Sequence, residues 1–162
     1  MKKAVVLYNS RGGNTKKVAH SIAKGLDADI FSVRKVPNLE KYNMLVIGTW
    51  VIAGKISPGG KRLLNKLKPE LKGKKVALFL TAGGPQEPIS EDSNETTENI
   101  IFARMKKIIE SKGLKVLNEH FSTKGAFRFI RFGPGKVFNA GLPDKEALKL
   151  AENFGQKLKK HI

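Results

Sequence analysis

A short run of small and polar residues near the start of the chain has the make-up of an anion-binding loop. The run is Ser10-Arg11-Gly12-Gly13-Asn14-Thr15. Its glycines let the backbone turn sharply and approach a ligand, and its hydroxyl and amide side chains can donate hydrogen bonds. A helical pattern begins at Thr15, so the free N–H groups of a helix N-terminus would face the same point. These features favour a phosphate; the alternative is an ordinary strand-to-helix turn whose glycines serve only its geometry.

Two later loops also follow apolar segments and have features of a ligand site. The second loop contains the only tryptophan and begins Gly48-Thr49-Trp50-Val51-Ile52-Ala53-Gly54. A large aromatic side chain at the end of a strand can stack on a planar ligand; the alternative is that Trp50 packs against the sheet or a helix. The third loop is made of small residues, which leave room for the edge of a flat ring, and reads Thr81-Ala82-Gly83-Gly84-Pro85.

The hydrophobic pattern predicts a scaffold that brings these loops together. Continuous apolar runs, typical of strands buried on both faces, precede the three loops at 4–8, 44–47 and 76–80, with further strand candidates at 30–33 and 114–121. Apolar residues at helical spacing lie between them, at 15–26, 59–67, 96–111 and from Pro143 onward. In the last of these helices the expected inner face is formed by Leu150, Ala151, Phe154 and Leu158. Strands that alternate with helices predict a parallel sheet covered on both faces, a three-layer α-β-α sandwich. In such sheets ligands bind beyond the carboxyl ends of the strands, where the strand order reverses.

The bulk composition limits the classes of protein. A length of 162 residues predicts a single domain spanning 1–162. The first apolar run is too short for a signal peptide or a membrane span, so we expect a cytoplasmic protein. The absence of cysteine excludes disulfides and cysteine-ligated metals, and the three histidines are too far apart to suggest a metal site. Neither the G-x-x-x-x-G-K-[ST] pattern nor the dinucleotide pattern G-x-G-x-x-G is present.

The chain is strongly basic. It has 31 Lys and Arg against 14 Asp and Glu, a formal net charge of +17. Such a charge suits a nucleic acid, an acidic protein or an anionic small ligand. The excess is mostly lysine without interleaved arginine and aromatic residues, which is a weak signal for nucleic acid, although the charge does not exclude that partner.

The three loops, taken in order, resemble those of the flavodoxin family. The family's phosphate loop usually reads Ser/Thr-x-Thr/Ser-Gly-Asn-Thr, to which residues 10–15 are similar. Residues 48–54 resemble its second loop, in which Gly-Ser/Thr-Pro is followed by an aromatic residue and Ala-Gly. Residues 121–125 and 141–144 are similar to later motifs of the family, so the resemblance extends over nearly the whole chain.

The resemblance implies a five-stranded parallel sheet of order 2-1-3-4-5 and a noncovalently bound FMN. It implies that the phosphate lies in the first loop, with contacts from Ser10, Arg11, Gly12, Gly13, Asn14 and Thr15. The isoalloxazine ring would lie between the second and third loops, against Thr49, Trp50, Val51, Ile52, Ala53, Gly54, Thr81, Ala82, Gly83 and Gly84.

The chain departs from the family pattern in ways that bear on the site. Gly12 replaces a hydroxyl residue, which removes one phosphate contact, and Arg11 could supply a charge-assisted one instead. Trp50 stands where many members have Pro and Ile52 where they have the aromatic residue, while Thr-Trp also occurs in this loop in long-known flavodoxins. The comparison with the first pattern makes Ile52 the residue that covers the ring, whereas the comparison with the Thr-Trp pattern makes it Trp50. We expect Trp50 to cover the ring. Ala82 replaces a residue that is often Cys.

The leading interpretation is an FMN-binding redox protein, either an electron carrier or a small flavin-dependent oxidoreductase. No residue stands out as a general acid or base, so the sequence does not separate the two. The alternative is a basic nucleic-acid-binding or protein-binding module that keeps the fold and has lost FMN. A phosphoacceptor receiver domain is excluded, because it needs carboxylates where this chain has Asn9-Ser10 and Gly48-Thr49.

The basic charge has an expected consequence for this chemistry. Reduced FMN is commonly an anion, which nearby positive charge stabilises. We therefore expect a less negative hydroquinone potential than acidic flavodoxins have, and an acidic redox partner if the protein carries electrons.

Two further segments have competing interpretations. Residues 127–132 read Phe-Arg-Phe-Ile-Arg-Phe. This pattern favours a half-buried strand with the phenylalanines inward; a lid over the flavin, or a contact strip for a partner or nucleic acid, is the alternative. The acidic stretch from Glu87 to Glu98 lacks the spacing of a calcium loop and is expected to be solvated.

Overall fold

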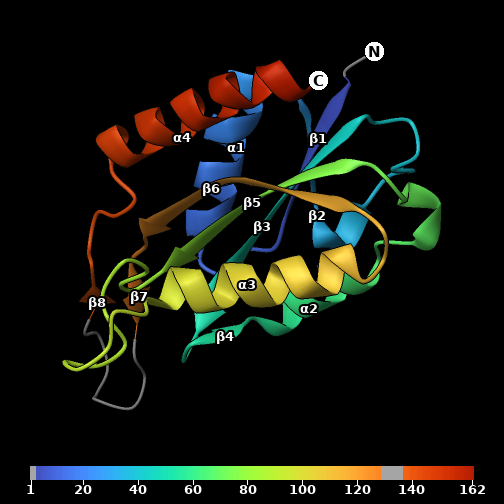
Figure 1. Ribbon diagram of the computed structural model, residues 1–162. Helices are drawn as coiled ribbons and strands as arrows, with labels where there is room; N and C mark the ends of the chain where they lie inside the picture. The colour runs from blue at the N-terminus through green and yellow to red at the C-terminus, as the bar shows by residue number, and fades with distance from the viewer. Residues whose placement is uncertain (1–2, 129–136) are drawn as a thin grey trace.

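The computed structural model describes residues 3–128 and 137–162 as strands that alternate with helices along the chain (Figure 1). The elements are β1 (Ala4–Tyr8), α1 (Asn14–Leu26), β2 (Asp29–Ser32), η1 (Val33–Lys35), β3 (Met44–Ile52), β4 (Lys55–Ile56), α2 (Pro58–Asn65), η2 (Pro69–Leu71), β5 (Lys75–Ala82), α3 (Thr97–Glu110), β6 (Lys115–Lys124), β7 (Phe127–Arg128), β8 (Val137–Phe138), α4 (Lys145–Leu158) and η4 (Lys159–His161).

The main sheet has the order β2-β1-β3-β5-β6, and each of these neighbours is paired in parallel. Counted over the parallel strands alone, this is the predicted order 2-1-3-4-5, so the predicted fold class is confirmed. The short β4 adds an antiparallel pair to β3, and β7 and β8 form a separate antiparallel pair. The strand order reverses between β1 and β3, which places the expected ligand crevice at their carboxyl ends.

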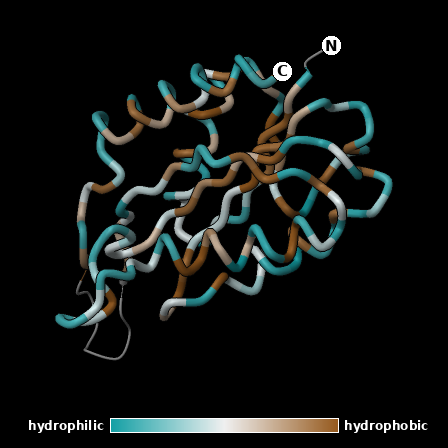
Figure 2. The backbone as a smooth tube through the Cα atoms, in the orientation of Figure 1, coloured by the Kyte–Doolittle hydropathy of each residue, from teal (hydrophilic) through white to brown (hydrophobic). Residues whose placement is uncertain are grey.

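Helices cover both faces of the sheet. Figure 1 shows α1 and α4 on one face and α2 and α3 on the other. Alternate residues of each strand therefore enter two different cores: Val5, Leu7 and Leu45 face α2 and α3, whereas Val6 and Val46 face α1 and α4. Figure 2 shows the hydrophobic segments gathered in these central strands. Burial on both faces explains why the strands are continuous apolar runs rather than alternating ones.

Helices α1 and α4 touch backbone to backbone. A Cβ atom on Gly25 would lie 2.0 Å from the carbonyl oxygen of Glu152, and one on Gly155 would lie 2.2 Å from that of Ile22. Both positions are therefore restricted to glycine by this close approach. The contact fixes α4 on α1.

Some details of the predicted elements are wrong. The strand expected to end at Gly48 continues to Ile52, because Thr49 and Trp50 remain paired with Leu80 and Thr81 of β5. Leu150, expected on the inner face of the last helix, is 53% exposed, whereas its neighbour Ala151 is buried. Residues 129–132 of the aromatic and basic segment lie outside the described residues. In the described part of the chain no helix is long and apolar enough to span a bilayer.

Candidate functional site

The first loop is a tight turn held by its own side chain. The Ser10 hydroxyl oxygen accepts a hydrogen bond from the backbone N–H of Gly13 at 3.1 Å. Gly13 has φ +94°, in the left-handed region that glycine adopts without strain. Cβ atoms built on Gly12 and Gly13 would meet nothing within 4 Å, so the space above the loop is open. The loop therefore presents bare backbone to solvent.

The helix that follows this loop differs from the other helices at its N-terminus. Ser57, Thr96 and Asp144 cap α2, α3 and α4 by accepting a backbone N–H with their side chains. Gly13 stands at the same position before α1 and offers no side-chain cap. Among the described residues, the N–H groups of Asn14, Thr15 and Lys16 have no hydrogen-bond acceptor. An uncapped, positive helix end of this kind is suited to an anion.

The polar side chains at the start of α1 tie the loop to its surroundings. Thr15 is 1% exposed, and its hydroxyl lies 2.8 Å from that of Thr81 in the third loop. Asn14 donates from Nδ2 to the carbonyl oxygen of Ala126 at 2.6 Å. These contacts bring the predicted residues of the first and third loops together. Whether Asn14 and Thr15 also contact a phosphate stays a prediction.

The second loop is a β-hairpin rather than an irregular segment. Strands β3 and β4 pair Ile52 with Lys55, and the turn residues Ala53 and Gly54 have φ 47° and 67°. Positive φ at both central residues is the geometry of a tight two-residue hairpin. The Arg104 guanidinium donates to the carbonyl oxygen of Gly54 at 3.3 Å, which tethers the turn to α3.

The two candidate ring-covering residues lie in different environments. Trp50 is half-buried, and its indole N–H lies 3.0 Å from the side-chain amide of Asn9, whose oxygen accepts this hydrogen bond in the amide orientation that satisfies its neighbours. Ile52 is 45% exposed near the tip of the hairpin. Thr49 is fully buried, and its hydroxyl lies 2.9 Å from that of Ser57, so it links β3 to the residue that caps α2. Trp50 is thus anchored beside the base of the first loop, and Ile52 projects at the rim; their roles toward a ring stay predictions.

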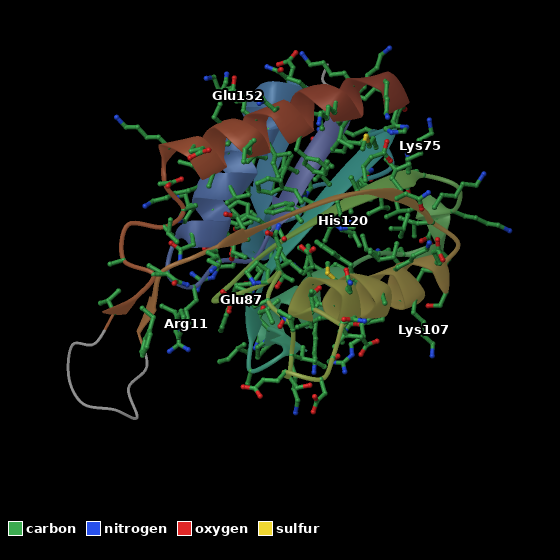
Figure 3. The ribbon with its side chains drawn as sticks, turned by 60° about the vertical axis from the view of Figure 1, so that its left-hand side comes forward. Arg11, Lys75, Glu87, Lys107, His120 and Glu152 are labelled. Atoms are coloured by element: carbon green, nitrogen blue, oxygen red, sulfur yellow. The ribbon has the colours of Figure 1, made fainter. Side chains whose placement is uncertain are left out.

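The third loop exposes backbone at the end of β5. Among the described residues, the N–H groups of Gly83 and Gly84 have no acceptor. The Glu87 side chain lies over Gly84, where a Cβ would be 2.3 Å from its Oε2. Glu87 also accepts from Lys124 Nζ at 2.5 Å, an ion pair between the loop and the end of β6. In Figure 3, Arg11 and Glu87 are seen near the same end of the sheet.

Two residues after β6, Phe127 and Asn139, also lie beside the third loop, although the three predicted loops do not include them. Asn139 donates from Nδ2 to the carbonyl oxygen of Gly83 at 2.6 Å. Phe127 packs against Gly83 and stacks on Phe138. The sequence signal for Phe127 is its place in the alternating aromatic and basic segment. Asn139 has no such signal, because its contact joins residues far apart in the chain.

Electrostatics at this end of the sheet are uneven. Arg11 is exposed and has no hydrogen bond or ion pair with the described residues. Lys16 and Lys17 lie in the first turn of α1, which contains no acidic residue. Glu87 is neutralised by Lys124. Within the described residues, no three His, Asp or Glu side chains gather as a metal site would require.

Two known proteins are similar to this chain in sequence. The chain is similar over 98% of its length to an uncharacterized protein of Methanocaldococcus jannaschii, at 30% identity over 99% of that protein. It is 33% identical over 52% of its length to the flavodoxin-like domain-containing protein BilS of Clostridioides difficile, and this match covers 49% of BilS.

Solved structures share the fold at lower identity. A WrbA-like flavodoxin from Agrobacterium tumefaciens has a TM-score of 0.73 at 13% identity, covering 99% of this chain and 97% of that one. Oxidised flavodoxin 2 from Bacillus cereus has a TM-score of 0.65 at 18% identity, covering 99% of both. The model of the flavodoxin domain family matches residues 5–128. The chain therefore belongs to the flavodoxin domain family.

Proposed function

We propose that this protein binds FMN noncovalently and works as a redox protein, either an electron carrier or a small flavin-dependent oxidoreductase. The observation that carries the proposal is the uncapped N-terminus of α1, where the N–H groups of Asn14, Thr15 and Lys16 have no acceptor among the described residues. It lies at the point where the strand order reverses between β1 and β3. The donors present, bare N–H groups and a hydroxyl, fit the phosphate end of FMN.

The residues of the first loop would hold the phosphate. The backbone N–H groups of α1 donate to its oxygens, and the Ser10 hydroxyl proton is free to donate because its oxygen already accepts from Gly13. The Arg11 guanidinium, which has no partner in the described part of the chain, adds a charge-assisted hydrogen bond in place of the hydroxyl that Gly12 lacks. Thr15 orients the start of the helix through Thr81. This set replaces part of the phosphate's hydration with fixed donors.

The second and third loops would hold the ring. The half-buried Trp50 and the exposed Ile52 supply apolar surface. The N–H groups of Gly83 and Gly84, which have no acceptor within residues 3–128 and 137–162, donate to ring oxygens. FMN, when bound, supplies one-electron and two-electron redox chemistry. The protein binds and orients the ring, and its charges set the energy of the reduced form. The solved relatives support this function, since they include an oxidised flavodoxin and a two-electron reduced flavodoxin from Megasphaera elsdenii.

The basic surface would tune the cofactor and select the partner. Positive charge at Arg11, Lys16 and Lys17 stabilises an anionic reduced flavin, so the hydroquinone potential is less negative than in acidic flavodoxins. The same charge favours an acidic redox partner, with an association rate that falls as salt rises. A spectroelectrochemical titration gives the potential, and a value as negative as that of acidic flavodoxins contradicts this part of the proposal.

A titration of the cofactor-free protein with FMN tests the proposed function. The expected result is saturable quenching of flavin fluorescence at one FMN per chain, with a yellow protein after gel filtration. Rapid bleaching by NADH or NADPH alone then indicates a reductase, and its absence indicates a carrier. A protein that stays colourless with FMN and binds DNA or RNA in a salt-sensitive manner contradicts the proposal.

A further inference from the structure

An aromatic pair lies beside the third loop. Phe127 of β7 and Phe138 of β8 stack with ring centroids 5.1 Å apart and an interplanar angle of 12°. The two residues are paired across the antiparallel strands, which fixes their rings side by side. Phe127 remains 41% exposed. Since Phe138 covers one of its faces, the exposed area belongs to the rest of the ring.

The pair is held in place from two directions. Asn139, directly after β8, donates from Nδ2 to the carbonyl oxygen of Gly83 in the third loop at 2.6 Å. Ala126, directly before β7, accepts from Asn14 Nδ2 at the start of α1 at 2.6 Å. The residues on either side of the pair are thus bonded to the third loop and to the proposed phosphate site. The position of Phe127 is therefore set relative to both.

The third loop has no aromatic side chain of its own. Thr81 to Pro85 are small residues, and Gly83 has no side chain over its backbone. Phe127 occupies that place, because a Cβ on Gly83 would lie 2.8 Å from Phe127 Cε1. A large apolar ring left partly exposed against bare backbone loses hydrophobic stabilisation that a bound planar molecule would restore. The ring thus marks a contact surface rather than a buried core position.

We propose that Phe127 forms the aromatic wall of the cofactor site on the side of the third loop and contacts the isoalloxazine ring of FMN. This inference rests on the proposed function and names a binding residue outside the second and third loops. Phe138 supports Phe127 from behind as a positioning residue. The phosphate is held at the first loop, so phosphate and ring contacts are contributed by separate residues.

Titration with riboflavin as well as FMN separates these two contributions, because riboflavin has the same ring and no phosphate. Phe127→Ala is expected to lower the affinity for FMN and for riboflavin by the same factor, about fivefold to tenfold for the loss of one aromatic contact. Phe127→Tyr is expected to restore the affinity and the quenching of flavin fluorescence. Arg11→Ala, in contrast, is expected to lower the affinity for FMN and leave the affinity for riboflavin unchanged. Ile89→Ala removes another exposed apolar side chain, 52% exposed, and serves as the control.

The outcomes separate the two proposals. Wild-type protein that binds neither flavin overturns the proposed function and this inference with it. Wild-type protein that binds FMN while Phe127→Ala binds both flavins with unchanged affinity and spectrum overturns this inference alone. Circular dichroism and thermal unfolding establish that each variant is folded. Phe127→Leu, which keeps an apolar side chain without the ring, is expected to bind as weakly as Phe127→Ala if stacking is the source of the affinity.

Discussion

The two edges of the sheet use their polar groups in opposite ways. At the amino edge, side chains cover backbone carbonyls. Lys74 donates to the carbonyl oxygens of Glu40 and Tyr42, and Lys112 donates to those of Leu64 and Leu67 at 2.8 and 2.9 Å. At the carboxyl edge, the first and third loops leave backbone N–H groups without acceptors among the described residues. One edge is closed by its own side chains, and the other is open to a ligand.

Titratable groups show the same difference. At the amino edge the Tyr42 hydroxyl donates to Asp29 at 2.7 Å, and burial together with this carboxylate raises the pKa of Tyr42 to about 12. Burial lowers the pKa of Lys112. At the carboxyl edge, Arg11 is exposed and unpaired with any described residue. Lysines at the amino edge are thus engaged by backbone carbonyls, whereas Arg11 at the carboxyl edge remains available to an anion.

Loss of Arg11 should have the largest effect at the open edge. Arg11→Ala removes a charge-assisted hydrogen bond to the phosphate, worth about 1.5–3 kcal/mol, so FMN affinity should fall roughly tenfold to a hundredfold. Lys115→Ala removes one positive charge at the amino edge and should leave the affinity nearly unchanged. Fluorescence titration measures both. Equal losses in the two variants would show that FMN responds only to net charge.

The backbone of the first loop gives the next largest effect. Gly13→Ala forces a Cβ into the left-handed region at φ +94° and should cost about 1–2 kcal/mol of stability. It should also disorder the anion site and weaken FMN binding. Gly12→Ala is the matched control for stability, because its Cβ meets nothing within 4 Å. Chemical denaturation of both variants tests this. An unchanged midpoint for Gly13→Ala would contradict the tight geometry assigned to the loop.

At the closed edge, Lys112 should matter for stability alone. Lys112→Met keeps the aliphatic stem but uncovers the carbonyls at the end of α2, which should cost about 1–2 kcal/mol of unfolding free energy. FMN affinity should not change, because the site lies at the opposite edge. Lys106→Met, which changes an exposed lysine of α3, the helix that ends just before Lys112, is the control. A fall in FMN affinity without a loss of stability would contradict the separate roles assigned to the two edges.

Tyr42 should give the smallest effect and one that depends on pH. Tyr42→Phe removes the hydrogen bond to Asp29 and should cost about 1 kcal/mol. Because the folded pKa is raised above the unfolded value of 10, this stability is fully present below pH 10 and is lost as the pH rises through about 12. Tyr8→Phe is the control. The unfolding free energies of the wild type and Tyr42→Phe are measured from pH 8 to 12. A difference between the two that stays constant over this range would contradict the assignment.

The fold follows from local patterns that the sequence shows directly. Strands buried on both faces are apolar throughout, so β1, β3 and β5 could be predicted from their continuous apolar runs. The extension of β3 beyond Gly48 could not be predicted, because glycine usually weakens a strand. Here the ring of Phe79 lies where a Gly48 side chain would be, so a glycine is required within the strand. Leu150 was misplaced because adjacent helical residues point about 100° apart, and Ala151 faces the core.

The site was predictable only in part. The glycine loop and the order of the three loops are local features, and the structure brings the first and third together through Thr15 and Thr81. Phe127 and Asn139 reach the third loop through contacts between residues that lie far apart in the chain. Periodicity and spacing carry no information about such contacts.

The most direct test is an NMR titration of ¹⁵N-labelled, cofactor-free protein with FMN. The account predicts saturable shifts of the backbone N–H signals of Asn14, Thr15, Lys16, Gly83 and Gly84, because these groups gain acceptors. Signals at the amino edge, such as those of Tyr42 and Lys112, should not move. Shifts confined to the amino edge, or no shifts at millimolar FMN, would contradict the claim that the open edge is the cofactor site.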